Sequence, residues 1–327
     1  MEENWERPTR LNVSRRELHL LIQPAFPGRT IQEYSTLDAG FANTNIRFRL
    51  DEGTSTYVLR LHQRDHMAAA RERALTALLR AGFLVPMPDL IYCDPLPERG
   101  THPYSIWRFV EGTLLRDLLT TLPPKELVDV AYACGRTLAP LGTLRFQSFG
   151  EFGPDLRIVH QYGEPSRFLA TEVQRCLFEG LAGRRLGTQL RDELWTVVEG
   201  TSPALSEIDG HYALAHCDYK RSNLIMTRTA TTWSVAAVLD WEFACAGPPL
   251  IDFGPFLRAG SRLPPGFQDA FARGYVDAGG ELPSEWLRLS RLLDLLSQMT
   301  FLGDPRDRPH VIEETIGVVR ETIRILG

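Results

Sequence analysis

A short segment of the chain, residues 216–223, carries side chains suited to phosphoryl transfer. Asp218 and Asn223 lie on this segment, and Asp240 follows at the end of an aliphatic run, residues 235–239. Phosphoryl transfer from a nucleotide needs a carboxylate that orients the attacking hydroxyl and hard oxygen ligands that hold Mg²⁺. We expect Asp218 to act as the base and Asn223 and Asp240 to bind Mg²⁺. The alternative is a loop in which these side chains only cap turns.

The order of these residues resembles the catalytic loop of protein kinases, which reads H-R-D-x-x-x-x-N and is followed by a metal-binding D-F-G. Here Cys217 stands in place of the Arg, and Asp240 begins D-W-E. Both departures are similar to the aminoglycoside phosphotransferase and choline kinase group. The enzymes of this group are kinase-like, phosphorylate small molecules, and typically read H-G-D-x-x-x-x-N and then I-D-W-E.

The resemblance implies an α+β, protein-kinase-like fold of two lobes, with a small antiparallel β-sheet in the first and mainly helices in the second. We expect residues 1–109 to form the nucleotide-binding lobe and residues 110–327 to carry the catalytic loop and the acceptor-binding helices. The implied cofactors are ATP or GTP and Mg²⁺. The implied acceptor is a hydroxyl of a small molecule such as an aminoglycoside, a sugar or an amino alcohol.

The same resemblance assigns three further residues around the catalytic loop. Lys220 corresponds to the Lys of the kinase R-D-x-K loop and would neutralise charge on the transferring phosphoryl group; a solvated Lys is the alternative. His216 is expected to hold the loop by hydrogen bonds. Asp252 begins a D-F-G, but it follows a G-x-P-type loop. We therefore expect Asp252 to brace the catalytic loop and Asp240 to bind the metal.

The turn between the first two expected strands holds candidate phosphate contacts. Gly40, Asn43 and Asn45 of this turn resemble the phosphate-binding turn of the small-molecule kinases, and Asn43 or Thr44 would order the loop. We expect backbone N–H groups of this turn to bind phosphate oxygens. The alternative is an ordinary hairpin.

Arg60 stands where protein kinases place the Lys that contacts the α- and β-phosphates, and Glu72 on the next helix is its expected ion-pair partner. Arg is always charged and can bind phosphate with two N–H groups, so the role survives the change. The alternative is a surface Arg and a solvated Glu. The V-E-G that ends residues 104–112 resembles the hinge of the family, so Arg108 would offer a backbone carbonyl and Val110 a backbone N–H to adenine. The alternative is a plain edge strand.

The acceptor site is expected among the later helices. Its candidate side chains are Trp241, Glu242, Asp252, Asp294, Gln298 and Phe301. The carboxylates of this part of the sequence are interleaved with arginines, so they do not form the dense acidic surface that would hold a polycationic aminoglycoside. An aminoglycoside is thus one of several acceptors that the sequence allows.

Hydrophobic periodicity places these residues on elements. An alternating pattern predicts strands at 31–37, 44–50 and 56–61, with shorter strands near 90–93 and 104–109. A helical pattern predicts helices near 14–26 and at 65–81. From Gly112 onward the pattern is mostly helical, interrupted by the catalytic loop and its flanking strands.

Composition narrows the partners. The protein has 327 residues and a net charge of −5, so no overall positive charge attracts nucleic acid or anionic membrane. Its five cysteines form no C-x-x-C pair, which favours reduced thiols in the cytoplasm over a disulfide framework or a zinc site. We expect no nucleic-acid partner, no membrane span and no secretory signal. The sequence leaves the oligomeric state open.

Two other functions fit parts of the pattern. A protein Ser/Thr kinase would share the catalytic loop, but the sequence lacks the Gly-rich loop, a D-F-G at the metal position and the A-P-E segment. A non-catalytic, nucleotide-binding pseudokinase is the other alternative. The joint presence of Asp218, Asn223 and Asp240 argues against it.

Overall fold

The computed structural model describes residues 5–6, 10–37, 43–82, 84–97, 102–258 and 263–327. Its first part is an antiparallel five-stranded sheet with the strand order β1-β2-β3-β5-β4. The strands are β1 (Ile31–Thr36), β2 (Thr44–Leu50), β3 (Thr56–Leu61), β4 (Leu90–Asp94) and β5 (Tyr104–Arg108). Each lies within two residues of a strand that the alternating pattern predicts.

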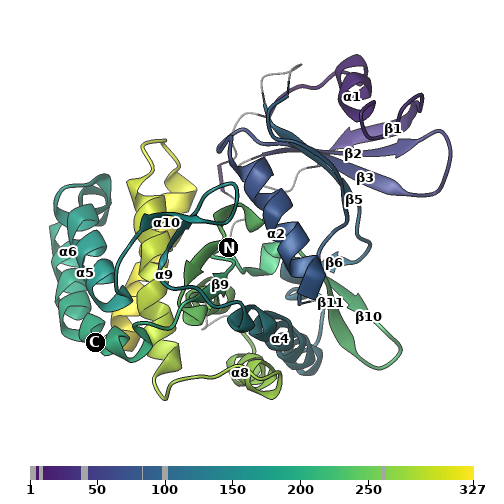
Figure 1. Cartoon of the computed structure of the whole chain (residues 1–327). Helices are drawn as coiled ribbons and strands as arrows, with labels where there is room; N and C mark the ends of the chain where they lie inside the picture. Colours follow the sequence, from purple (N-terminus) through teal and green to yellow (C-terminus); the bar gives the residue numbers. More distant parts are fainter. Residues whose placement is uncertain (1–4, 7–9, 38–42, 83, 98–101, 259–262) are drawn as a thin grey trace.

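The alternation in β2 explains how this sheet packs. Ile46, Phe48 and Leu50 are buried, whereas Arg47 and Arg49 between them are not, because successive side chains of a strand point to opposite faces. The buried face packs against helix α1 (Arg15–Ile22), whose N-terminus is closed by a capping box between Ser14 and Glu17. In Figure 1, helix α2 (Ala68–Gly82) lies on the side of the sheet that faces the rest of the protein.

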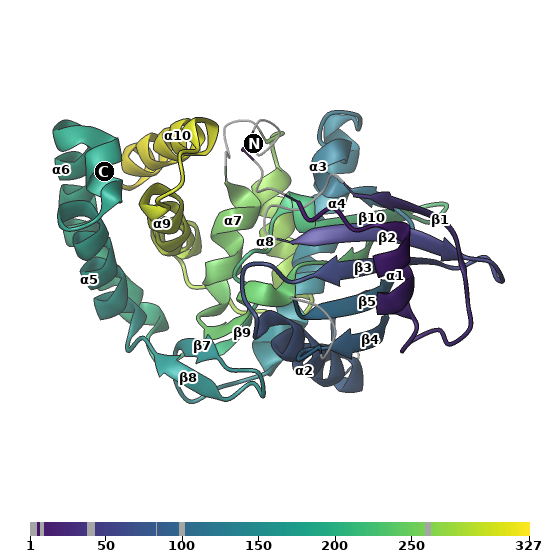
Figure 2. The same cartoon turned by 90° about the horizontal axis from the view of Figure 1, so that it is seen from above.

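The second part is mainly helical. Its helices are α3 (Leu115–Leu118), α4 (Pro124–Leu138), α5 (Pro165–Phe178), α6 (Leu181–Thr201), α7 (Phe253–Leu257), α8 (Phe267–Asp277), α9 (Trp286–Gly303) and α10 (Pro309–Leu326). Figure 2 shows α5, α6, α9 and α10 together at the end of the molecule away from the five-stranded sheet. Helices α4 and α8 approach closely at Gly135 and Gly274, where an added Cβ would lie 2.0 Å and 2.1 Å from a carbonyl oxygen of the other helix.

Two small sheets hold the segments that carry the predicted catalytic residues. One has the order β11-β10-β6 and consists of β6 (Thr113–Leu114), β10 (Leu224–Arg228) and β11 (Trp233–Val238). The other has the order β8-β7-β12-β9 and consists of β7 (Gly150–Phe152), β8 (Ile158–Gln161), β9 (Ala213–Ala215) and β12 (Cys245–Gly247). The predicted catalytic loop runs from the end of β9 to the start of β10, and Asp240 follows β11.

Two of the three clusters of buried side chains among the described residues correspond to the two parts of the protein. One joins α1 to the five-stranded sheet, and the largest runs through the helical part. Leu75 and Leu79 of α2 belong to the largest cluster, so α2 links the sheet to the helices. A lobe boundary between residues 109 and 110 remains a prediction. None of the described helices is both long and apolar enough to cross a bilayer.

Candidate active site

The segment after β9 brings the predicted base, Lys and Asn together. Asp218 Oδ2 accepts a hydrogen bond from Asn223 Nδ2 at 2.9 Å and lies 3.1 Å from Lys220 Nζ. Tyr219, between them, is fully buried, and its hydroxyl donates to the Cys134 carbonyl at 2.8 Å. The loop is therefore anchored in the helical core by one side chain while its polar groups face one another.

His216 ties this loop to the end of β11. Its Nε2 donates to the Leu239 carbonyl at 2.8 Å, and its Nδ1 accepts the Asp218 N–H at 3.2 Å. Burial lowers the pKa of His216 to about 4, so the ring is neutral near pH 7 with its proton on Nε2. The ring thus makes the loop-holding hydrogen bonds that the sequence predicts for it.

Asp240 reaches the same place from the other side. The Leu239 N–H donates to the Asn223 carbonyl at 2.8 Å, which sets the two predicted metal ligands side by side. Asp240 itself has a left-handed backbone, with φ of 62°. Burial raises the pKa of Asp240, but the positive charges of Arg60 and Lys220 outweigh it, so the net pKa lies below the ordinary value of 3.8. The carboxylate is therefore ionised.

Arg60 on β3 contacts three acidic or amide side chains at once. Its Nη1 donates to Glu72 Oε1 at 2.9 Å, its Nε donates to Asn45 Oδ1 at 3.1 Å, and its Nη2 donates to Asp240. The ion pair expected with Glu72 is present. The contact with Asp240 was not foreseen, and it joins the five-stranded sheet to the catalytic loop region.

Burial raises the pKa of Glu72 to about 7, and the Arg60 charge opposes this shift. Glu72 also lies 3.9 Å from His62 Nε2. Burial and the charge of Arg60 lower the pKa of His62 to about 3, so that ring is neutral and Arg60 supplies the positive charge here.

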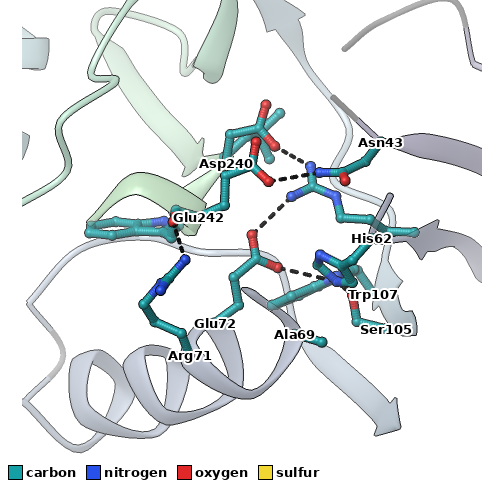
Figure 3. Close-up of polar contacts among 12 residues, drawn as sticks. Asn43, His62, Ala69, Arg71, Glu72, Ser105, Trp107, Asp240 and Glu242 are labelled. Carbon is teal, nitrogen blue, oxygen red and sulfur yellow. Dashed lines mark hydrogen bonds and ion pairs between the residues drawn. The ribbon is translucent and has the colours of Figure 1, made fainter. Parts of the chain in front are cut away.

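Glu242 and Asn43 form a second link between the two parts of the protein. Asn43 Nδ2 donates to Glu242 Oε2 at 3.0 Å, and both residues are buried (Figure 3). Burial, followed by the charge of Asp240, raises the pKa of Glu242. Arg71 of α2 holds the same segment by donating to the Glu242 carbonyl at 2.8 Å. Sequence reasoning missed Arg71, although its place beside Glu72 on one helix was a usable signal.

The rest of the predicted phosphate turn contributes less. Gly40 lies outside the described residues. Thr44 is fully buried, and its hydroxyl accepts the Leu11 N–H at 3.0 Å and contacts Gln63 Oε1 at 2.5 Å. Thr44 does not line the cavity described next, whereas Asn43 and Asn45 do.

These groups open into one cavity of about 1320 Å³ between the five-stranded sheet and the helical part. The predicted hinge residues Arg108 and Val110 line it. Apolar side chains from both parts of the protein line the same end, and sequence reasoning missed them: Val58, Met87, Trp107, Leu114, Ile225 and Val238. Such a slot suits a flat, largely apolar ring.

The other end of the cavity is also rich in apolar side chains. Its lining includes Phe149, Tyr162, Phe168, Leu293, Leu296 and Phe301. The charged side chains there are of both signs: Glu151 and Glu172 are negative, and Arg306 and Arg308 are positive. Trp241 and Glu242 line the cavity too, although both are largely buried.

Three predicted acceptor contacts are placed elsewhere. Asp294 forms a buried ion pair with Arg258, at 2.6 Å, and accepts from Gln298 Nε2 at 3.1 Å. Asp252 accepts the N–H groups of His216 and Cys217 at 2.8 Å and 2.7 Å. None of the three lines the cavity, because each side chain already serves a partner inside the protein. The acceptor prediction is corrected for these three residues, and Asp252 has the bracing geometry that the sequence favours over metal binding.

Magnesium would find few protein ligands here. Among the described residues, no group of three or more His, Cys, Asp and Glu side chains is placed to hold a metal ion. Nδ2 makes both side-chain hydrogen bonds of Asn223, which leaves Oδ1 as its ligand atom, and Asp240 is ionised. One carboxylate and one amide oxygen suit Mg²⁺, since this ion keeps several waters and binds nucleotide phosphates rather than an all-protein cage.

Comparison with known proteins supports the chemistry that the residues of this site suggest. The model of the phosphotransferase enzyme family matches residues 33–290 of the sequence. Acyl-CoA dehydrogenase family member 11 of Gallus gallus is 29% identical over 236 residues, which are 70% of this chain and 28% of that protein. The Homo sapiens protein of the same name is 29% identical over 220 residues, or 65% and 26%. The present sequence thus spans little more than a quarter of the length of these relatives.

Solved structures share the fold. The GDP complex of wild-type aminoglycoside 2′-phosphotransferase-IIIa superposes with a TM-score of 0.70 at 17% identity, covering 95% of this chain and 99% of that one. A thermostable mutant of aminoglycoside phosphotransferase APH(4)-Ia, in a ternary complex with AMP-PNP and hygromycin B, gives 0.67 at 20% identity, with 94% and 97% coverage. The expected α+β, protein-kinase-like two-lobe fold is confirmed.

Proposed function

The chain belongs to the phosphotransferase enzyme family, and we propose that it transfers the γ-phosphoryl group of ATP or GTP to a hydroxyl of a small molecule. The observation that carries the proposal is the meeting of Asp218, Asn223, Asp240 and Arg60 at one wall of a large cavity. Phosphoryl transfer is mostly positioning and charge stabilisation, and this wall offers an oriented carboxylate, cations and hard oxygen ligands.

The catalytic side chains divide the work by charge. Asp218 orients the acceptor hydroxyl and takes its proton as the new bond to phosphorus forms. Lys220, at 3.1 Å from Asp218, is placed to offset negative charge on the transferring group. Arg60 binds the nucleotide phosphates, and Glu72 with Asn45 fixes the guanidinium so that it does not swing freely.

Asn223 and Asp240 would hold Mg²⁺, which when bound neutralises charge on the nucleotide phosphates. Because Asp240 accepts from Arg60 in this structure, nucleotide and metal binding should redistribute that contact. Asn223→Ala and Asp240→Ala should each weaken binding of the magnesium nucleotide, measured by titration calorimetry with and without Mg²⁺. Asp252→Asn is the matched control, because its carboxylate binds backbone N–H groups instead.

The nucleotide base fits the apolar slot at the hinge. Val58 from the five-stranded sheet and Ile225 and Val238 from a small sheet line this slot, so a purine ring would lie between the two parts of the protein. Arg108 and Val110 would then offer the backbone carbonyl and N–H that recognise the base. The side chain of Arg108 donates instead to Asp89 and Ser55, which leaves recognition to its backbone.

The acceptor end favours a substrate with an apolar body. Aromatic and aliphatic residues dominate its walls, and the charged residues among them are of both signs. Arg306 and Arg308 form ion pairs with Asp304. Glu172 is paired with Arg175, so a polycationic aminoglycoside would gain little from that carboxylate. A hydroxyl compound with few positive charges is the better candidate among aminoglycosides, sugars and amino alcohols.

An acceptor-dependent nucleotide-consumption assay tests the proposal. The purified protein is incubated with MgATP or MgGTP and a panel that includes aminoglycosides, sugars, amino alcohols and uncharged alcohols with apolar bodies. We expect phosphorylated product, identified by mass spectrometry, with members of the last group. Nucleotide binding without transfer to any hydroxyl, including serine and threonine of protein substrates, would favour a pseudokinase.

A further inference from the structure

Two cysteine side chains meet beside the catalytic loop. Cys217 Sγ and Cys245 Sγ lie 2.9 Å apart, and both residues line the cavity. The pairing of β9 with β12 explains the contact, because Cys245 lies opposite Ala215 and Cys217 follows two residues further on. Neither thiol has a task in the proposed phosphoryl transfer.

Cys217 adopts a backbone conformation that suits glycine better. Its φ is 62°, in the left-handed region, which residues with a Cβ rarely adopt. Asp252 holds it there by accepting its N–H at 2.7 Å. A side chain is thus kept at a position where glycine would be unstrained, and that side chain is a thiol facing a second thiol.

We propose that Cys217 and Cys245 form a redox modification site, in which a peroxide oxidises the pair to a disulfide that stops phosphoryl transfer. One thiolate attacks the peroxide O–O bond, which gives a sulfenic acid and releases the first water (or alcohol). The second thiol attacks the sulfenic sulfur and releases a water. The two thiols lose two electrons and two protons, and the peroxide is reduced.

The disulfide would disturb the base directly. A disulfide has an S–S distance of about 2.05 Å, so the two sulfur atoms must approach by about 0.9 Å. Cys217 immediately precedes Asp218, so the share of this approach that the Cys217 backbone takes up also moves Asp218. A displacement of about 1 Å at a catalytic group can lower a rate on the order of 100-fold, which is the upper bound expected here. This part of the inference rests on the proposed function.

The reaction should be slow at neutral pH. The hydrogen bond between the two thiols, together with burial, raises the pKa of Cys217 well above its ordinary value. Little of it is therefore thiolate, which is the reactive form. The reagent must also be small enough to enter the cavity, so hydrogen peroxide is the probe of choice.

The test uses the full-length protein, first reduced and then treated with hydrogen peroxide under native conditions. Remaining thiols are alkylated, and the protein is digested and examined by mass spectrometry. We expect a peptide pair linked through Cys217 and Cys245, together with a loss of acceptor phosphorylation of up to about 100-fold that dithiothreitol reverses. The linked peptide is seen whether or not the protein is a phosphotransferase, so failure of the proposed function is distinguished from failure of this inference.

Variants make the result specific, each compared with its own reduced form. Cys217→Gly relieves the left-handed strain and should resist peroxide, and Cys245→Ser should give no linked peptide. Cys93→Ser and Cys176→Ser, which change thiols outside the pair, should respond like the wild type. The inference is overturned if folded wild type gives no linked peptide, or if Cys217→Gly loses as much activity to peroxide as the wild type does. Because the wild-type peptide map stands alone, a variant that misfolds does not decide the matter.

Discussion

Arg60 is the residue at which the sheet, helix α2 and the catalytic region meet. Its side chain is 13% exposed and forms ion pairs with both Glu72 and Asp240. Burial lowers the pKa of Arg60, but the negative charges of Asp240 and Glu72 outweigh burial, so the net pKa lies above its ordinary value. The guanidinium is therefore permanently charged, and it serves both the fold and the phosphate site.

Two replacements of Arg60 distinguish the loss of its positive charge from the loss of its hydrogen-bond geometry. Arg60→Ala leaves two acidic side chains without their cation, so we expect the free energy of unfolding to fall by about 3–5 kcal/mol, with a higher nucleotide KM and a lower kcat. Arg60→Lys keeps the charge but cannot reach three partners with one ammonium group, and should lose less. Urea unfolding and steady-state kinetics measure both effects.

Arg80→Ala is the control for this pair, because Arg80 forms an exposed ion pair with Asp89. It should change the free energy of unfolding by less than about 1 kcal/mol. An Arg60→Ala protein with normal stability and a normal nucleotide KM would remove Arg60 from both roles.

At the scale of elements, the short 3₁₀ helix η5 (Pro249–Asp252) holds the loop between β9 and β10 in place. Asp252 is buried at the end of this short helix and accepts two loop N–H groups. Burial raises the pKa of Asp252 from 3.8 to about 7, and the two N–H groups oppose that shift without cancelling it. Ionisation of the buried Asp252 therefore destabilises the folded protein, and this cost depends on pH.

This cost predicts the pH dependence of stability. A carboxyl group whose folded pKa is raised contributes stability that is present below about pH 4 and lost as pH rises through about 7. Asp252 should therefore lower the free energy of unfolding across this window by at most about 1.4 kcal/mol per pH unit, and Glu72 contributes in the same sense. His62 and His216 contribute in the opposite sense, because burial lowers their pKa values to about 3 and about 4. Asp252→Asn should therefore make the slope of stability against pH more positive than in the wild type, by up to about 1.4 kcal/mol per pH unit. Urea titrations across the window measure it, and an unchanged slope in the variant would contradict this assignment.

Sequence patterns predicted elements better than the contacts between them. Alternation in β2 and the spacing of Arg60 and Glu72 are local signals, and both led to the observed geometry. Strands β7 and β12 have three residues each, too few for a period, and were not foreseen. Without β12 the meeting of Cys217 with Cys245 could not be predicted.

The acceptor side chains show the same limit. Asp294 and Gln298 lie one turn apart on α9, and the sequence cannot tell whether that face of the helix meets a cavity or another helix. In the structure this face meets Arg258, which directly follows α7. A buried ion pair of this kind depends on which elements pack together, which local periodicity does not contain.

At the scale of the whole molecule, the two parts touch closely at Gly112. This residue has φ of 148°, and an added Cβ would lie 2.5 Å from Ile225 Cγ2 and 2.6 Å from the Met226 carbonyl oxygen. It connects the five-stranded sheet to β6, which pairs with β10. The backbone at Gly112, at the hinge end of the cavity, is thus packed too closely against β10 to accept a larger side chain without a shift.

Gly112→Ala should therefore lower the free energy of unfolding by about 1–3 kcal/mol and also raise the nucleotide KM, because the wall of the slot must move. Gly200→Ala is the matched control: Gly200 lies in α6 with open space around its Cβ position. That variant should be neutral or slightly more stable, by up to about 1 kcal/mol. Thermal unfolding and nucleotide titration of both variants check the contrast, and equal behaviour of the two would contradict it.

The central claim is that this molecule transfers phosphoryl groups with Asp218 as the base. The most direct measurement compares wild type with Asp218→Asn, which keeps the shape of the side chain, for both nucleotide affinity and phosphorylation of the acceptor found by screening. We predict an unchanged nucleotide dissociation constant and a kcat lower by about 10²–10⁴-fold in the variant. Phosphorylation at the wild-type rate by Asp218→Asn would contradict the account.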